Sequence, residues 1–236
     1  MPNKLISDIR LFMSRVPNAD GQSLPTPCGS GRTAVALRRI AMKLREGGFS
    51  LGDFDHLYVN LTPCLPEGTA QIAARSVHRE TAWLRYVDMG VSEAALADES
   101  APDSLAVAAA EKCLLLFGQD EAARQLVRSA VREALAQGED MCMRFKEKRA
   151  PGLTAVVYLR LLDSGLYHPL LTVTDDAGLE LLRADLPPCM ELHALGEIRL
   201  SRKAVTILPR KSIFAEGLSP LSFSIAPCPA QSSPFA

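Results

Sequence analysis

Apolar and polar residues alternate along residues 54–62, the most informative segment of this chain. On one side of an extended backbone lie Leu57, Val59 and Leu61. The other side mixes aromatic and polar groups: Phe54, His56, Tyr58 and Asn60. A period of two predicts a β-strand with one core-facing side and one mixed side. Two prolines and a glycine in residues 63–68 predict a sharp end to this strand.

Longer stretches repeat apolar residues every three or four positions, which predicts amphipathic helices. The first begins at Ser30, a favourable N-cap residue, and runs to about Glu46. A second stretch covers residues 103–137 and is interrupted at Gly118, so it predicts two helices, the later of which begins near Asp120. These two helices follow each other almost directly, which is typical of a helical hairpin.

Short extended runs predict the remaining strands. Before Gly138 they lie at residues 5–16 and 83–87. After Gly138, turn residues separate a series of such runs, at residues 141–146, 155–162, 169–174, 179–183, 197–201 and 204–208. This spacing is typical of a β-meander. Residues 92–102 are predicted to form an acidic loop. The Pro-rich tail at residues 217–236 is predicted to lack a fixed fold or to lie on the surface as an extended strip.

The order of these elements predicts an α+β fold, in which an antiparallel or mixed sheet is flanked by three main helices and a β-meander occupies the C-terminal half. We expect an α+β region at residues 1–138 and a β-rich region at residues 139–216, packed on the first as one unit. The Pro-rich tail at residues 217–236 completes the chain.

The charge, cysteine content and hydrophobicity of the chain limit which partners and cellular locations we expect. The 26 Lys and Arg residues nearly balance the 27 Asp and Glu residues, so no global field favours a direct nucleic-acid partner. The six cysteines are dispersed, which favours reduced thiols over a disulfide scaffold. Charges interrupt the N-terminal segment, and no run approaches the roughly 18–20 apolar residues of a membrane span. We therefore expect a cytoplasmic protein without a membrane partner.

Two residue sets suggest catalysis or metal binding, and both have unfavourable spacing. His56 and Cys64 lie almost a full strand apart, and an extended strand would separate them by about 26 Å. The segment at residues 78–80 could combine with Cys189 and His193, but this set does not match a known zinc signature. We therefore predict no catalytic residues, no metal and no cofactor. A Cys- or metal-dependent hydrolase with an unrecognised site stays open as the alternative.

Several short strings resemble the bacterial polymorphic-toxin immunity proteins, and most closely the family called immunity protein 39. These strings are a basic helix, a Gly-Phe passage, a Phe-Asp-His-Leu-Tyr-Val-Asn strand, a Cys-Leu-Pro-Glu-Gly turn and a Trp-Leu-Arg-Tyr-Val strand. In this chain they occupy residues 38–45, 48–49, 54–60, 64–68 and 83–87. The resemblance covers about the first 150 residues.

The resemblance implies a non-catalytic protein that binds and neutralises a cognate toxin. The segment around the mixed strand is then the expected contact surface, with candidate partner-binding residues Asp53, Asp55, His56, Tyr58 and Glu67. A few desolvated anchors would supply most of the binding energy of such a surface. A homodimer and a scaffold role in a larger assembly stay open.

Overall fold

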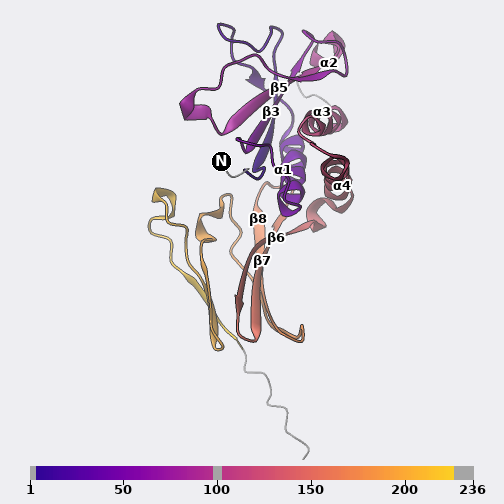
Figure 1. The fold of residues 1–236 in the computed structure, drawn as a ribbon. Helices are drawn as coiled ribbons and strands as arrows, with labels where there is room; N and C mark the ends of the chain where they lie inside the picture. The colour runs from indigo at the N-terminus through magenta and orange to yellow at the C-terminus, as the bar shows by residue number, and fades with distance from the viewer. Residues whose placement is uncertain (1–3, 98–102, 226–236) are drawn as a thin grey trace, which may run out of the picture. The chain divides into compact units, whose positions relative to one another are not determined.

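The computed structural model describes residues 4–97 and 103–225 (Figure 1). The chain divides into two compact units, Met1–Met141 and Cys142–Ala236. The short 3₁₀ turn η2 (Gly138–Asp140) precedes this boundary, close to the predicted change in character after Gly138. The α+β fold is confirmed: unit 1 holds a mixed sheet with helices, and unit 2 contains the predicted meander.

Unit 1 is built on a five-stranded sheet in the order β2-β1-β3-β5-β4. The central strands β1 (Asp8–Met13), β3 (His56–Thr62) and β5 (Leu84–Gly90) run parallel to one another. At the edges, the short strands β2 (Thr26–Pro27) and β4 (Ala70–Ile72) pair antiparallel. Parallel neighbours cannot be joined by a tight hairpin, so each central pair needs a crossover connection.

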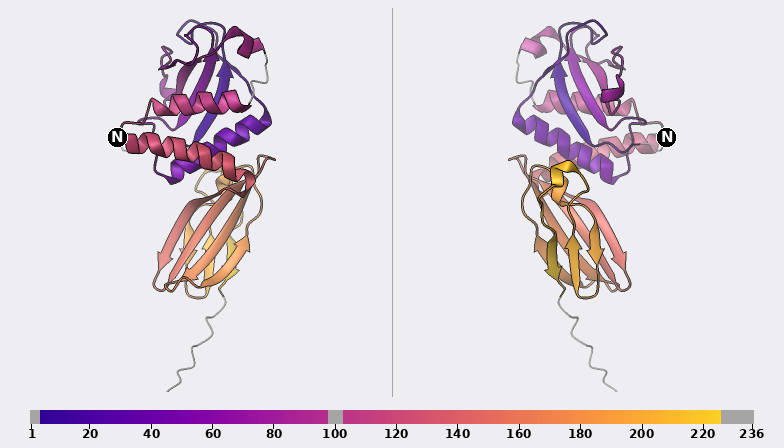
Figure 2. Two further views of the ribbon diagram at one scale, coloured as in Figure 1. Left: turned by 90° about the vertical axis from the view of Figure 1, so that its right-hand side faces the viewer. Right: turned by 90° about the vertical axis from the view of Figure 1, so that its left-hand side faces the viewer.

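Helices α1 (Gly31–Glu46), α3 (Asp103–Leu115) and α4 (Glu121–Gln137) lie on one side of this sheet (Figures 1 and 2). α1 begins where predicted, because the Ser30 hydroxyl accepts a hydrogen bond from the Thr33 N–H. α1 packs on β1, α3 packs on β3 and β5, and α4 packs on α1 and α3. The helices therefore cover the same face of the sheet in two layers.

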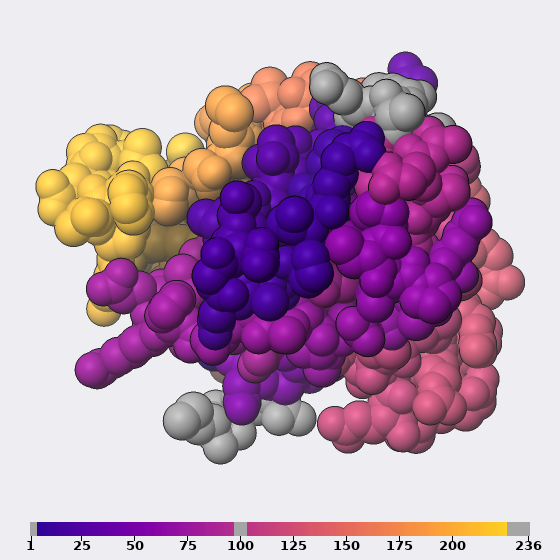
Figure 3. All heavy atoms as spheres, turned by 90° about the horizontal axis from the view of Figure 1, so that it is seen from above, coloured from indigo at the N-terminus to yellow at the C-terminus, as the bar shows by residue number. Residues whose placement is uncertain are grey.

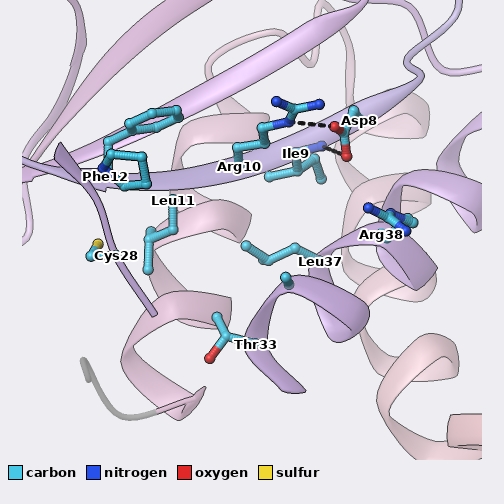
Figure 4. A pocket seen from close by; sticks show the side chains of 11 residues that line it. Asp8, Ile9, Arg10, Leu11, Phe12, Cys28, Thr33, Leu37 and Arg38 are labelled. Carbon is cyan, nitrogen blue, oxygen red and sulfur yellow. Dashed lines mark hydrogen bonds and ion pairs between the residues drawn. The ribbon is translucent and has the colours of Figure 1, made fainter. Parts of the chain in front are cut away.

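The core of unit 1 lies between this face and the helices. The side chains predicted to face the core, Leu57, Val59 and Leu61, are fully buried. Leu37 and Leu44 of α1, which packs on β1, are equally buried, and Leu37 faces the buried Ile9 of β1 (Figure 4). Removing each large aliphatic side chain from water contributes about 1.5–3 kcal/mol, so this contact fixes which side of the sheet the helices occupy.

Unit 2 contains two antiparallel sheets that lie face to face (Figure 2). The first is the predicted meander, with strands β6 (Cys142–Ala150), β7 (Leu153–Leu161), β8 (Tyr167–Asp175) and β9 (Glu180–Asp185). The second consists of β10 (Ile198–Leu200), β11 (Ala204–Ile207) and β12 (Leu221–Ser224). Leu159 and Leu171 of the first sheet and Val205 of the second are fully buried.

For residues 221–224, the prediction that the Pro-rich tail lacks a fixed fold is wrong. β12 lies within it and pairs with β11, which places Phe223 opposite Val205. Leu221 and Phe223 are half-buried whereas Ser222 and Ser224 are exposed, so the segment has the period of a strand. A strand of four residues shows only two alternations, so the sequence alone does not reveal it within a proline-rich segment. The rest of the tail, residues 226–236, lies outside the described residues.

The predicted acidic loop at residues 92–102 also needs correction, because Glu93–Ala97 forms the short helix α2. The Ser92 hydroxyl accepts a hydrogen bond from the Ala95 N–H, which is a typical helix N-cap. A single helical turn and a half has no apolar period that the sequence can reveal. Residues 98–102 of the predicted loop lie outside the described part of the chain.

Gly90, at the end of β5, packs closely against the backbone of residues 65 and 66 in the loop after β3. A Cβ atom at Gly90 would lie 2.0 Å from the Pro66 carbonyl oxygen. We predict that Gly90→Ala lowers the free energy of unfolding by about 2 kcal/mol or more, since the loop after β3 must move. Urea unfolding followed by the fluorescence of Trp83, the single tryptophan of the chain, measures this change in unit 1.

Gly31→Ala is the matched control, because no atom lies within 4 Å of a Cβ at that position in the first turn of α1. It should leave the stability unchanged or raise it by up to about 1 kcal/mol. Equal stabilities of the two variants would show that the approach of Pro66 to Gly90 does not constrain the fold.

Candidate functional site

The side of the sheet opposite the helices carries aromatic and charged side chains. The parallel register aligns Arg10, Tyr58 and Tyr86 in one row across the three central strands. Figure 4 shows Ile9 directed toward Leu37 of α1, whereas Arg10 lies on the other side of β1. We define the aromatic face by six residues on this second side: Arg10, Phe12, His56, Tyr58, Trp83 and Tyr86.

Tyr58 is the centre of the aromatic face. Its ring centroid lies 4.8 Å from that of Phe12 and 5.4 Å from that of Tyr86. Trp83 stands edge-on to Tyr58 at 6.3 Å and to His56 at 4.6 Å. Each such contact adds about 0.5–1.5 kcal/mol to the burial of the rings. The cluster therefore holds its members in fixed orientations.

Within this cluster the centre is buried and the edge is accessible. Tyr58 is 6% exposed, whereas Trp83 is 38% exposed. Burial raises the pKa of Tyr58, and the pKa of Tyr86 is raised for the same reason, so both phenols stay neutral at physiological pH. Tyr58 therefore forms the buried base of the aromatic face, whereas the Trp83 indole is partly accessible to solvent.

Charged side chains border the aromatic cluster in two local pairs. Arg10 Nε donates a hydrogen bond to Asp8 Oδ2 over 2.7 Å, and its guanidinium carbon lies 5.6 Å from the centre of the Tyr58 ring. His56 Nδ1 and Asp55 Oδ1 are also 2.7 Å apart. These contacts orient the Arg10 side chain, which is 54% exposed. Arg10 and Trp83 are thus accessible but preorganised.

A buried polar pair lies beside the aromatic cluster, toward the carboxyl ends of the strands. Asn60 Nδ2 donates a hydrogen bond to Asp88 Oδ1 over 2.7 Å, and both side chains are buried. Burial raises the pKa of the Asp88 carboxyl, although the hydrogen bond from Asn60 and the charge of Arg75 act in the opposite direction. The oxygen of the Asn60 amide, Oδ1, is buried and has no hydrogen-bond partner within residues 4–97 and 103–225.

Hydrogen bonds from Arg75 anchor the loop at residues 14–25 over this end of the sheet. Its Nε donates to Asn18 Oδ1 over 2.7 Å, and its Nη2 donates to the carbonyl oxygens of Gln22 and Ser23 over 3.0 and 2.9 Å. In the space-filling view the indigo segment that contains this loop lies at the surface of unit 1 (Figure 3). The second face of the parallel sheet is thus covered by a tethered loop at one end and by aromatic rings at the other.

The structure brings three of the five predicted partner-binding residues together. Asp55, His56 and Tyr58 lie on or beside the aromatic face, where Trp83 contacts both His56 and Tyr58. Asp53 is exposed in the segment that precedes β3. Glu67 is exposed in the loop after β3, at the opposite end of that strand from His56. The five predicted residues therefore do not form one surface, because Glu67 lies at the opposite end of β3 from the others.

The sequence-based prediction did not include the residues that β1, β5 and the residue before β5 contribute: Arg10, Phe12, Tyr86 and Trp83. A signal for them was present, since residues 5–16 and 83–87 were both predicted to form strands. What the sequence lacked was the register that sets Arg10 beside Tyr58, because a parallel register between strands joined by long crossovers leaves no local pattern.

The candidate catalytic sets are not assembled. His56 begins β3, and Cys64 lies beyond its other end with Sγ 3.7 Å from the Arg15 carbonyl oxygen. The His193 ring stacks on Phe214. Across the described residues, no three or more His, Cys, Asp or Glu side chains are placed to hold a metal ion.

A cavity of about 240 Å³ lies between β1 and α1 (Figure 4). Leu11 and Leu37 line it, with Cys28 in its wall. Burial raises the pKa of the Cys28 thiol to about 11, so this group stays protonated and is a weak nucleophile at neutral pH. Asp8, Thr33 and Arg38 also line the cavity, so its wall combines apolar and polar side chains.

No protein-family model, curated protein or solved structure matches this chain. No helix among the described residues is long and apolar enough to cross a membrane.

Asp88 gives the stability of unit 1 a pH dependence of defined sign. Because the pKa of the buried carboxyl is raised, the folded state binds a proton before the unfolded state does as the pH falls. The free energy of unfolding should therefore rise as the pH falls through this raised pKa, and the gain should be complete near about pH 4, where the unfolded carboxyl is also protonated. Urea unfolding over a pH series, compared with Asp88→Asn, isolates this contribution.

Asp88→Asn keeps an oxygen that can accept from Asn60, so its stability at neutral pH should match or exceed that of the wild type. Asp88→Ala removes the acceptor and should cost about 1–3 kcal/mol. Parallel pH profiles for the wild type and Asp88→Asn would contradict a buried, proton-coupled carboxyl.

Proposed function

We propose that this chain is a non-catalytic, immunity-type protein that neutralises a cognate bacterial toxin by binding it with the aromatic face of unit 1. The observation that carries the proposal is the combination of accessible Trp83 and Arg10 with a packed support beneath them. Trp, Tyr and Arg are the residues that most often dominate binding energy at protein interfaces.

Preorganisation favours this role. Binding normally costs side-chain entropy, about 0.5–1.5 kcal/mol for each flexible side chain that becomes fixed. Trp83 is already held by His56 and Tyr58, and its Nε1 donates to the Glu80 carbonyl oxygen over 3.2 Å. Arg10 is already held by Asp8. A partner that covers this face would gain apolar contact without ordering its anchors.

The charge pattern favours a protein partner over a polyanion. Arg10 is paired with Asp8, and the Asp55 carboxylate also lies beside the face, so carboxylates offset the arginine and no basic patch forms. A neutral face of this kind provides little long-range steering, so association should proceed at about 10⁵–10⁶ M⁻¹s⁻¹ and depend weakly on salt.

The resemblance to immunity proteins supports the same surface. Two of its strings, residues 54–60 and 83–87, include His56, Tyr58 and Trp83 and overlap β3 and β5. In this proposal the protein acts in the cytoplasm, needs no cofactor, and works by covering an active site or blocking a movement of the toxin.

Co-expression with the product of the neighbouring gene, followed by co-purification and titration, tests the proposal. Trp83→Ala combined with Arg10→Glu should weaken binding by at least about 100-fold, because both accessible anchors are lost. Cells that produce the toxin should lose protection to the same extent.

Arg32→Glu and Leu135→Ala are matched controls, because both residues are exposed elsewhere on unit 1. They should leave affinity and protection unchanged. If the Trp83 and Arg10 double variant is folded and still protects fully, the aromatic face is not the binding surface.

A further inference from the structure

The cavity between β1 and α1 lies within unit 1, and the proposed function does not use it. Leu11 and Leu37 are directed into it from the strand and from the helix (Figure 4). Its apolar lining is completed by Ile9, Phe12, Pro27 and Ala34. Pockets that bind small molecules are typically lined in this way, with a few polar groups that orient the ligand. The lining therefore suits a ligand with an apolar body.

The cavity follows the outer edge of β1. Successive side chains of a strand point to opposite faces, so a cavity lined by every residue from Asp8 to Phe12 runs along the strand edge. β2 pairs with β1 only at Phe12 and Met13, which leaves residues 8–10 without a second neighbouring strand among the described residues. The Ile9 N–H instead donates to Asp8 Oδ1 over 3.0 Å. An edge that satisfies its own donor is better suited to a small molecule than to an added peptide strand.

Three charged residues line the cavity, and one of them has no counter-ion. Arg10 Nε donates to Asp8 Oδ2 over 2.7 Å, so these two charges offset each other. Arg38 of α1 is half-buried, and it forms no hydrogen bond or ion pair with any residue in the described part of the chain. The wall of the cavity therefore has one cation with unused hydrogen-bond donors.

The remaining polar groups near the cavity do not supply a partner for this cation. The Asp103 carboxylate accepts hydrogen bonds from the hydroxyls of Ser30 and Thr33, so it is already engaged at the start of α1. Burial raises the pKa of the Cys28 thiol to about 11, so this side chain adds no negative charge at neutral pH. The anion that matches Arg38 must therefore come from a ligand.

We propose that this cavity binds a small monocarboxylate with an apolar chain or ring, and that the Arg38 guanidinium holds its carboxylate. A guanidinium can donate two parallel hydrogen bonds to a carboxylate, which fixes the orientation of the ligand. One unpaired cation matches one negative charge, whereas a polyanion would be repelled by Asp8 on the same wall. An apolar cavity of about 150 Å³ accepts benzene, so a cavity of about 240 Å³ suits a ligand of about ten non-hydrogen atoms.

Isothermal titration of the full chain with octanoate, which has about ten non-hydrogen atoms, tests the proposal. Octanoate should bind with a dissociation constant of about 1 mM or below, as expected for a ligand of this size. Octan-1-ol has the same chain without the charge and should bind at least about tenfold more weakly. Inorganic phosphate should not bind measurably, because it lacks the apolar body.

Two variants address the two parts of the site. Arg38→Gln should weaken octanoate binding at least about tenfold without loss of stability, because the side chain it replaces has no partner to lose. Ala34→Leu should weaken binding to a similar extent by filling the cavity, and the exposed position on α1 tolerates a leucine. Arg32→Gln is the matched control, because Arg32 is exposed on the same helix and does not line the cavity.

Trp83→Ala separates this site from the proposed function. It removes an anchor of the aromatic face and should leave octanoate affinity unchanged, whereas Arg38→Gln should leave toxin binding unchanged. Methyl NMR locates the ligand, because the signals of Leu11 and Leu37 should shift on addition of octanoate and those of Leu171 in unit 2 should not.

Four outcomes would overturn the proposal. Octanoate does not bind at concentrations up to about 10 mM, octan-1-ol binds as tightly as octanoate, Arg38→Gln keeps the affinity of the wild type, or the methyl shifts exclude Leu11 and Leu37. Circular dichroism of each variant verifies that weaker binding does not reflect loss of fold.

Discussion

The parallel pairing of β1, β3 and β5 is the constraint on which the rest of unit 1 depends. Parallel sheets are normally covered on both faces, because their crossover connections place helices there. Here α1, α3 and α4 all lie on one side. The other face must therefore be closed by its own side chains and by loops. This requirement accounts for both the ring cluster around Tyr58 and the loop that Arg75 fastens over Asn60 and Asp88.

The same constraint connects stability to function. A face closed by aromatic rings leaves the outermost members of the cluster accessible, so Trp83 and Arg10 are both part of the packing and available to a partner. The buried Asn60–Asp88 pair is a weaker source of stability, because desolvating a carboxylate offsets much of what its hydrogen bond contributes. Its role is better understood as fixing where the covering loop lies.

The sequence predicted those features that depend on local periods and caps. The alternation at residues 54–62, the cap at Ser30 and the meander after Gly138 were all readable, and each is present. Features that depend on long-range register were not readable. Nothing local sets Arg10 beside Tyr58 or brings Trp83 against His56, and no spacing indicates that Ile213 and Phe214 remain exposed. The candidate site was therefore predicted in its central strand and missed in both neighbours.

The most direct test of the central claim is hydrogen exchange of the chain alone and in complex with the co-purified product of the neighbouring gene. Binding should slow exchange at the backbone amides around the aromatic face, in residues 8–12, 56–60 and 83–86. Exchange along the outer helix α4 should not change. Protection confined to α4 or to unit 2, with no change on the aromatic face, would contradict the assignment of this face as the binding surface.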